Sequence, residues 1–199
     1  MRREAPGAGT LLALAMLTAC RTLPTTTPPP SGPWQERRPQ LQALAHFELR
    51  GRVALSANGT GFNANLRWVE DGARSQLALE GPLGVGGMHI DATGDELEIV
   101  NARGERLSSA AAHAELVNRL GFDVPLASLR YWVLGVPDPA RPSEETLDEP
   151  QQRLSALTQD GWHIAYAAYT AAGAQTLPAR LTLERESVRV RLLVEDWQL

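Results

Sequence analysis

Alternation of apolar and polar residues recurs along most of this chain and restricts its fold more than any other feature. Between residues 47 and 56 the odd positions hold Phe, Leu, Gly, Val and Leu, while the even positions hold Glu, Arg, Arg, Ala and Ser. A period of two is typical of a β-strand that buries one face. By this criterion we predict strands at residues 47–56, 62–68, 76–80, 88–92, 96–100, 153–158, 162–166, 179–184 and 187–197.

The connections between most of these strands are short. Asn58-Gly59, for example, is a dipeptide that two-residue hairpins prefer. The exception is residues 136–150, which are rich in proline and acidic residues and are predicted as a long loop. Consecutive strands joined by tight turns form an antiparallel meander. Such a sheet has one apolar face, which has to be covered or curled into a barrel.

Three segments are predicted as helices, of which about two are available to cover this face. The first is residues 34–46, although Pro39 interrupts it. In residues 109–120 apolar side chains recur at helical spacing, and Gly121 supplies a stop. The third is residues 125–134. The predicted fold is therefore mainly β, of the α+β class, with a curled antiparallel sheet, a helical lid and space between them.

An export signal occupies the N-terminus. Two arginines precede an apolar run at residues 11–17, which is too short to remain as a membrane span. The run ends in Leu17-Thr18-Ala19-Cys20, which resembles the bacterial lipobox, whose cysteine is acylated as the signal is removed. The alternative is a plain secretory signal that contains a cysteine. Arg21 stands where aspartate retains such lipoproteins in the inner membrane, which implies the outer membrane.

These features divide the chain into three parts. Residues 1–19 are predicted as a lipoprotein signal peptide. Residues 20–33 comprise the lipidated Cys20 and a tether rich in Pro and Thr, a composition typical of semi-rigid spacers. Residues 34–199 form the folded domain.

Charge and motif content argue against several classes of function. The 19 basic residues are all arginine and face 23 acidic residues, so the net charge of −4 disfavours nucleic acid as the main partner. The four histidines lack a metal-ligand spacing, the single cysteine cannot form an internal disulfide, and no Gly-x-Ser-x-Gly motif occurs. We predict neither an enzyme, a metal site nor a cofactor.

A glycine-rich turn at residues 81–87 joins two predicted strands. It lacks the spacing of a phosphate-binding loop. Leu83 stands at its apex, between Pro82 and Gly84, and glycines cannot shield a neighbour from solvent. Leu83 either folds back onto the core, which spacing alone favours, or projects as an apolar tip that could enter lipid.

From about Trp34 to Trp197 the chain resembles the LolB family of outer-membrane lipoprotein receptors. The resemblance rests on several short motifs and on their order along the chain. The Leu-x-x-Trp-x-x-Gly-x-Pro pattern within residues 129–137 is the most specific of them. The others are Arg50-Gly51, Gly81-Pro82-Leu83-Gly84, Tyr166-Ala167-Ala168-Tyr169, Leu177-Pro178-Ala179 and Glu195-Asp196-Trp197.

The resemblance implies an unclosed antiparallel β-barrel with a helical lid over an apolar cavity. It implies a monomer, lipid-anchored on the periplasmic face of the outer membrane, that accepts acylated lipoproteins from the soluble carrier LolA and inserts them into the outer membrane. By the same resemblance Leu83 delivers cargo into lipid. The predicted cavity residues are the inward apolar side chains of the sheet and the lid: Phe47, Leu49, Phe62, Leu66, Leu79, Met88, Ile90, Leu116, Leu120, Trp132, Ile164 and Tyr166.

Two other functions are compatible with this sequence. A scaffold lipoprotein would have a filled core without a lipid cavity. An anchored lipid carrier would bind lipids in its cavity without transferring lipoproteins. For most of the cavity residues taken singly, ordinary core packing is the alternative role.

Overall fold

The computed structural model describes residues 33–82, 87–149 and 151–199. Within these residues, three helices and a series of strands follow one another. In order they are α1 (Trp34–Gln42), β1 (His46–Ala57), β2 (Thr60–Asp71), β3 (Arg74–Glu80), β4 (Met88–Thr93), β5 (Glu96–Val100), β6 (Arg106–Ser108), α2 (Ser109–Leu120), α3 (Leu126–Val133), β7 (Glu144–Leu147), β8 (Leu154–Gln159), β9 (Trp162–Ala172), β10 (Gln175–Arg185) and β11 (Val188–Gln198).

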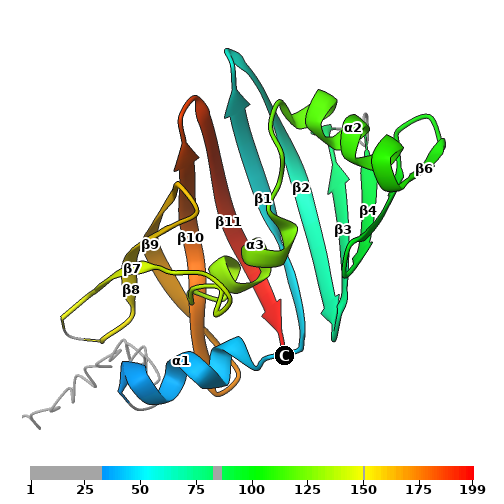
Figure 1. The fold of residues 1–199 in the computed structure, drawn as a ribbon. Coiled ribbons are helices and arrows are strands. Elements are labelled where there is room, and N and C mark those ends of the chain that lie inside the picture. Colours follow the sequence, from blue (N-terminus) through cyan, green and yellow to red (C-terminus); the bar gives the residue numbers. More distant parts are fainter. Residues whose placement is uncertain (1–32, 83–86, 150) are drawn as a thin grey trace, which may run out of the picture.

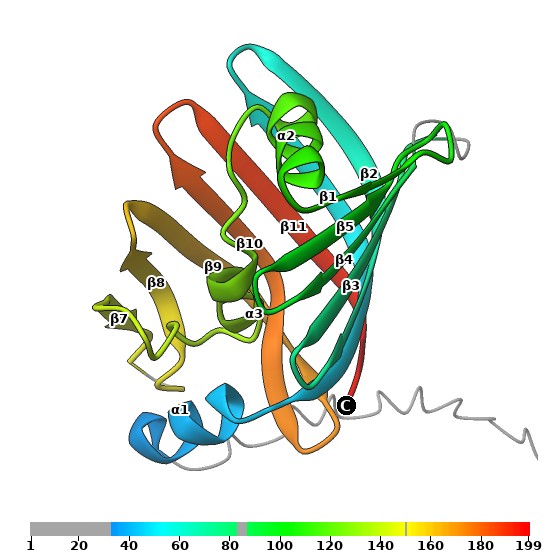
Figure 2. The same cartoon turned by 45° about the vertical axis from the view of Figure 1, so that its right-hand side comes forward.

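The strands form one antiparallel sheet of 11 strands in the order β6-β5-β4-β3-β2-β1-β11-β10-β9-β8-β7. Neighbours in the sheet are neighbours in the chain, except that β1 pairs with β11 and so joins the two ends of the domain. The sheet is strongly curved and open between β6 and β7. Helices α2 and α3 lie on its concave side (Figures 1 and 2). This arrangement confirms the predicted mainly β fold, an unclosed barrel with a helical cover.

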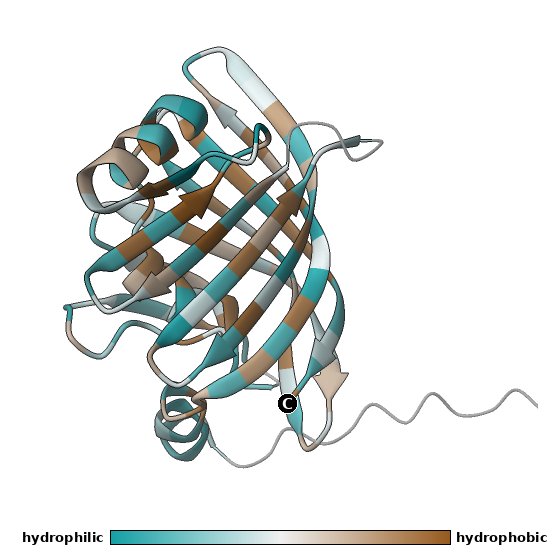
Figure 3. Ribbon diagram, turned by 90° about the vertical axis from the view of Figure 1, so that its right-hand side faces the viewer, coloured by the Kyte–Doolittle hydropathy of each residue, from teal (hydrophilic) through white to brown (hydrophobic). Residues whose placement is uncertain are grey.

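Alternation along the strands gives the sheet two chemically different faces. One cross-strand row, Phe62, Leu55, Val190 and Leu183, is apolar and faces the helices. The next row, Asn63, Ala54, Arg191 and Thr182, faces outward. Figure 3 shows the result as bands of hydrophobic and hydrophilic residues that alternate along the strands facing the viewer.

The Asn58-Gly59 turn and the end of α2 at Gly121 form as the sequence predicts. Asn58 and Gly59 both have positive φ, at 51° and 80°, and form the two-residue link between β1 and β2. This geometry matches the right-handed twist of the paired strands. Gly121 ends α2 with a φ of 82°, and its N–H donates to the Val117 carbonyl at 2.8 Å.

Helix α1 differs from its prediction in length and continuity. It ends at Gln42 rather than at residue 46 and continues through Pro39. Pro39 removes one backbone donor, but α1 also has tertiary anchors. The Trp34 Nε1–H donates to Glu145 at 2.9 Å, and the Arg37 guanidinium donates to the Gln152 carbonyl at 2.6 Å. These bonds attach α1 to the β7–β8 end of the sheet, and burial lowers the pKa of Arg37.

Several strand limits also differ from the predictions. Strand β7 lies within the segment predicted as a loop, residues 136–150, and β6 was not predicted. Both are short edge strands, of four and three residues, in which a period of two cannot be recognised. Strand β9 extends six residues past its predicted end at residue 166, because the stretch of small residues there lacks alternation yet still pairs with β10.

Candidate functional site

An apolar cavity of about 100 Å³ lies between the concave face of the sheet and the helices that cover it. Seven strands of the sheet, β4, β3, β2, β1, β11, β10 and β9, supply its floor, and the connection between α2 and α3 supplies much of its roof. All the residues around it are apolar. They are Val53, Leu55, Phe62, Leu66, Trp68, Leu77, Leu79, Ile90, Leu120, Phe122, Val124, Pro125, Leu126, Leu129, Trp132, Val133, Trp162, Leu183, Val190 and Leu192.

The structure brings only some of the predicted cavity residues to this space. Those that line it are Phe62, Leu66, Leu79, Ile90, Leu120 and Trp132. The others are packed elsewhere on the concave side and do not border the cavity. They are Phe47, Leu49, Met88, Leu116, Ile164 and Tyr166, all of which are buried.

Specific contacts account for several of the residues that do not reach the cavity. Phe47 belongs to an aromatic cluster, with ring centroids 5.9 Å from Trp68 and 5.7 Å from Trp197. Tyr166 donates a hydrogen bond of 3.0 Å to the Trp132 carbonyl, and burial raises the pKa of its hydroxyl well above the ordinary value. These side chains therefore support the cavity wall instead of forming it.

Sequence reasoning missed the residues of the roof. Phe122, Val124, Pro125 and Leu126 lie in or beside the α2–α3 connection and border the cavity. No periodicity marks so short a segment. By contrast, Val53, Leu55, Val190 and Leu192 share the inward face of predicted strands, so the alternation itself could have identified them.

The most specific motif of the sequence shapes the end of α3. Gly135 has a φ of 76°, its N–H donates to the Trp132 carbonyl at 3.0 Å, and the Val136 N–H donates to the Tyr131 carbonyl at 3.2 Å. This pair of bonds is a Schellman motif. A side chain at position 135 would also meet Pro178, whose Cγ would lie 3.0 Å from the added carbon. The motif therefore ends α3 against β10.

A buried ion pair fixes α3 to the other half of the sheet. The Arg130 guanidinium lies 3.3 Å from Glu70 on β2 and donates to the Leu44 carbonyl at 3.2 Å. Glu70 is buried and accepts hydrogen bonds from the Trp68 indole at 3.1 Å and the Ser75 hydroxyl at 2.5 Å. Both hydrogen bonds reach Oε2, and Oε1 faces Arg130. A buried carboxylate is tolerated when it is hydrogen-bonded and paired with a cation in this way.

Gln159 on β8 connects α3 to the segment that follows it. Its side-chain oxygen accepts the Trp132 indole N–H at 2.8 Å and the Asp138 backbone N–H at 2.9 Å. Its side-chain NH₂ donates to the Asp138 and Arg141 carbonyls, each at 3.0 Å. Helix α3 is therefore held by polar contacts on two sides of the cavity.

Helix α2 packs on the sheet mainly through apolar side chains. Ala112, Leu116 and Leu120 form its buried stripe, at intervals of four residues. Val117, the apolar residue that follows Leu116, lies off this stripe and is 39% exposed. The side-chain NH₂ of Asn58 donates to the Gly121 carbonyl at 3.4 Å, at the point where α2 ends.

The chemistry around the cavity is that of binding. Within the ranges 33–82, 87–149 and 151–199, no group of three or more His, Cys, Asp or Glu residues could hold a metal ion. None of the helices in those ranges is long and apolar enough to cross a membrane. The cavity can exclude water from an apolar ligand, and it offers no nucleophile or acid–base pair.

Two of the predicted functional residues lie outside the described residues. They are Cys20 and Leu83, and Gly84 lies outside them as well. Pro82, which precedes Leu83, is described and is exposed at the end of β3.

An open antiparallel half-barrel with an apolar cavity under a helical cover defines a class of proteins that shelter apolar ligands. A solved DUF1329 family protein from Desulfovibrio piger shares this fold, with a TM-score of 0.57 over 82% of this chain and 89% of that chain at 8% identity. The family model described as outer membrane lipoprotein LolB matches residues 45–197, and the chain belongs to this family.

Curated relatives match over most of the chain. The chain is 32% identical to the outer-membrane lipoprotein LolB of Nitrosococcus oceani over 191 residues, which is 95% of each chain. It is 34% identical to that of Pseudomonas putida strain W619 over 167 residues, covering 83% of this chain and 80% of the relative.

Proposed function

We propose that this protein is the outer-membrane receptor that accepts acylated lipoproteins from a carrier of the LolA kind and passes them to the outer membrane. The observation that carries the proposal is the wholly apolar cavity between the sheet and its helical cover, in a chain of the LolB family. Each acyl methylene removed from water contributes about 0.8 kcal/mol, so a cavity of this kind can hold acyl chains without an energy source.

Transfer also requires the cargo to leave. The receptor has to bind acyl chains more favourably than the carrier does, and the bilayer has to bind them more favourably still. The alternative function, an anchored lipid carrier, needs only the cavity and has no such gradient. A scaffold would leave the apolar cavity without a use.

The size of the cavity implies that its cover moves. Pockets that enclose drug-sized ligands measure roughly 300–1,000 Å³, whereas this one measures about 100 Å³. Helix α3 is anchored by Arg130, Trp132 and Gln159, as described above. Helix α2 lies on the sheet through its apolar stripe. We therefore assign the movement to α2 and the connection that follows it.

Membrane attachment and delivery belong to parts of the chain outside the described residues. We assign residues 1–19 to a signal peptide, Cys20 to lipidation and residues 20–33 to a tether that precedes the domain of residues 34–199. We assign Leu83 to the insertion of cargo into lipid. The lipobox and the family resemblance support these assignments.

A transfer assay with matched lid variants tests the proposal. A chain with Cys20→Ala, which lacks the acyl anchor, is mixed with a carrier loaded with triacylated lipoprotein, and outer-membrane vesicles are added afterwards. Leu129→Glu places a charge at the cavity, whereas Ala127→Glu places the same charge on the exposed side of the same helix. We expect Leu129→Glu to reduce acceptance of cargo at least about tenfold, because burying a carboxylate among apolar side chains is costly. Ala127→Glu should accept cargo normally.

The second step separates delivery from binding. Leu83→Glu should accept cargo but fail to release it to the vesicles. If cargo stays on the carrier with the Cys20→Ala chain itself, the receptor function is excluded. If free lipid binds in the cavity but lipoprotein does not, the chain is an anchored lipid carrier.

A further inference from the structure

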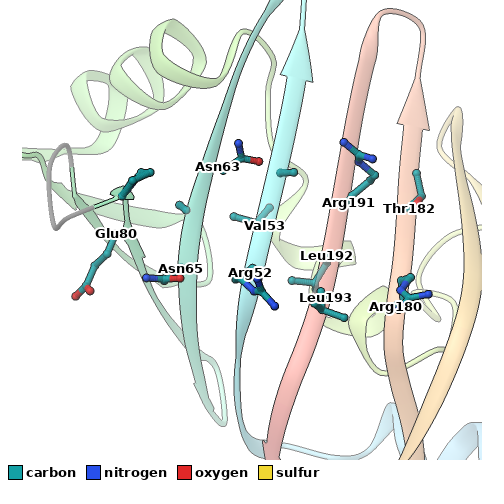
Figure 4. A pocket seen from close by; sticks show the side chains of 13 residues that line it. Arg52, Val53, Asn63, Asn65, Glu80, Arg180, Thr182, Arg191, Leu192 and Leu193 are labelled. Atoms are coloured by element: carbon teal, nitrogen blue, oxygen red, sulfur yellow. The ribbon is translucent and has the colours of Figure 1, made fainter.

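A second hollow, of about 570 Å³, lies on the outward face of the sheet, away from the apolar cavity. Figure 4 shows three arginine side chains that project into this region from neighbouring strands: Arg52 on β1, Arg191 on β11 and Arg180 on β10. Arg191 lies opposite Ala54 and Thr182, and Arg180 lies opposite Leu193. These directly opposite residues are uncharged and supply no counter-charge, and Glu184, a diagonal neighbour of Arg191, is paired with Arg189.

Two of these arginines differ from the other arginines of the outward face. Arg50 and Arg67 both pair with Glu48, Arg74 pairs with Asp91, and Arg189 pairs with Glu184. Arg180 and Arg191 have no acidic partner among the described residues, and both are exposed.

The register brings the three positive charges close together. Arg191 is the diagonal cross-strand neighbour of both Arg52 and Arg180, an arrangement in which Cα atoms lie about 7–8 Å apart. Arg52 pairs with Glu195 at 2.7 Å. The carboxylate of Glu80, which also borders the hollow, stands on β3, three strand spacings or about 14 Å from β11. Like charges held this close repel one another unless an anion neutralises them.

We propose that this hollow binds the phosphate group of anionic phospholipids at the membrane surface. A guanidinium group presents two parallel N–H donors that match a phosphate, and here two such groups are free. Asn63, Asn65 and Thr182 line the same hollow and offer further hydrogen-bond donors to headgroup oxygens. The proposal rests on the proposed function for the presence of a membrane nearby.

The position of the hollow favours a lipid surface over an acidic protein. Cargo has to enter on the concave side, where the apolar cavity lies, so a carrier meets that side and not the outward face that holds the hollow. The hollow is broad and open, and Pro82, at the start of the connection to β4, forms part of its border. Because the chain as a whole is acidic, a local excess of arginine on one face would also orient the domain against an anionic surface.

Vesicle binding by a charge-matched pair of variants tests the proposal. The chain with Cys20→Ala carries in addition either Arg180→Gln with Arg191→Gln or, as the control, Arg103→Gln with Arg106→Gln. The control removes the same charge from exposed arginines that pair with Glu105 and Glu98. Binding is measured by co-sedimentation with phosphatidylcholine vesicles and with mixed phosphatidylcholine–phosphatidylglycerol vesicles. Circular dichroism confirms folding of each variant.

We expect the Arg180/Arg191 variant to bind the mixed vesicles roughly 25-fold more weakly than the parent, or about fivefold per arginine. The control should bind nearly as the parent does, and binding by the parent should weaken as salt is added. Equal binding by the two variants would overturn the proposal. So would a variant that keeps vesicle binding and loses binding to the carrier, since that result would assign the hollow to a protein partner.

Acceptance of lipoprotein, measured on the same proteins, separates this proposal from the proposed function. The Arg180/Arg191 variant should still accept cargo from the carrier, because its cavity is unchanged. If the parent itself accepts no cargo, the proposed function fails, and the phospholipid result is judged by vesicle binding alone.

Discussion

The concave and outward faces of the sheet come from the same strands but work by different physics. On the concave face, side chains such as Leu55, Leu66 and Val190 surround a cavity without a polar residue. On the outward face, arginines and carboxylates stand in cross-strand pairs, such as Arg67 with Glu48 and Arg74 with Asp91. Apolar contact is non-directional and suits chains of varied length and conformation, whereas guanidinium groups recognise an anion through directed hydrogen bonds.

The two faces also differ in how their charged side chains are neutralised. Most arginines of the outward face are neutralised by a neighbour, and the exceptions gather at one hollow. On the concave side, Glu70 carries a buried charge beneath α3, where one of its oxygens accepts two hydrogen bonds and the other lies 3.3 Å from the Arg130 guanidinium. The unpaired arginines are therefore exposed to water, where they can bind a ligand. The buried Glu70 holds α3 in place through Arg130. The following variants test this comparison in decreasing order of expected effect.

Gly51→Ala should have the largest effect, because it disturbs the register that keeps the two faces separate. The β1–β11 register shifts between Arg50 and Gly51, so that Glu195 is the extra residue that pairs with Arg52. A Cβ at position 51 would lie 2.0 Å from the Leu193 carbonyl oxygen. We expect a loss of about 3 kcal/mol in the free energy of unfolding, measured by urea denaturation.

Gly87→Ala is the matched control for this variant. A Cβ at position 87 would have Leu79 oxygen at 3.5 Å as its nearest neighbour, an ordinary contact. If both variants lose the same free energy of unfolding, the close approach of β11 is not the reason why position 51 requires glycine.

Arg130→Met should have the next largest effect, because it leaves Glu70 buried without its counter-charge. The expected loss is about 2–3 kcal/mol in the free energy of unfolding. Arg141→Met removes an arginine that is 54% exposed and pairs with Asp160, so it should change stability little. Equal effects in thermal unfolding would mean that the concave ion pair contributes no more than an exposed one.

Arg74→Gln should have the smallest effect, and the effect should depend on pH. Hydrogen bonds from Arg74 hold the pKa of Asp91 below its ordinary value. The pair therefore contributes stability above the ordinary aspartate pKa and loses it as the pH falls through the lowered value. Near neutral pH we expect the variant to melt about 1–2 °C below the parent, and in acid the two melting curves should converge. A difference that persists or grows in acid would contradict this assignment.

Local sequence signals predicted much of the fold. The period of two located most strands and sorted their side chains into two faces, Asn58-Gly59 set a hairpin and Gly121 ended a helix. These features depend on residues that are close together in the chain, so the sequence specifies them directly. The short strands β6 and β7 were missed for the same reason, because three or four residues hold too few repeats of the pattern.

The candidate site was predictable only in part. Alternation identified Phe62, Leu66, Leu79 and Ile90 as inward residues, and they do line the cavity. Leu49 and Ile164 have the same pattern but lie in closed packing, with no exposed surface. Which inward residues border open space depends on where the cover rests, and that is set by contacts between distant segments, such as Arg130 with Glu70 and Trp132 with Gln159.

The sequence by itself determined that this protein has a curved sheet with one apolar and one charged face. The tertiary structure alone decided that β1 meets β11, that the 122–126 segment roofs the cavity, and that Arg180 and Arg191 lie together with no acidic partner among the described residues. The physical reason is that a strand's side-chain period is a local property of its backbone. Cavities and clusters of charge arise where strands far apart in the chain are brought into register.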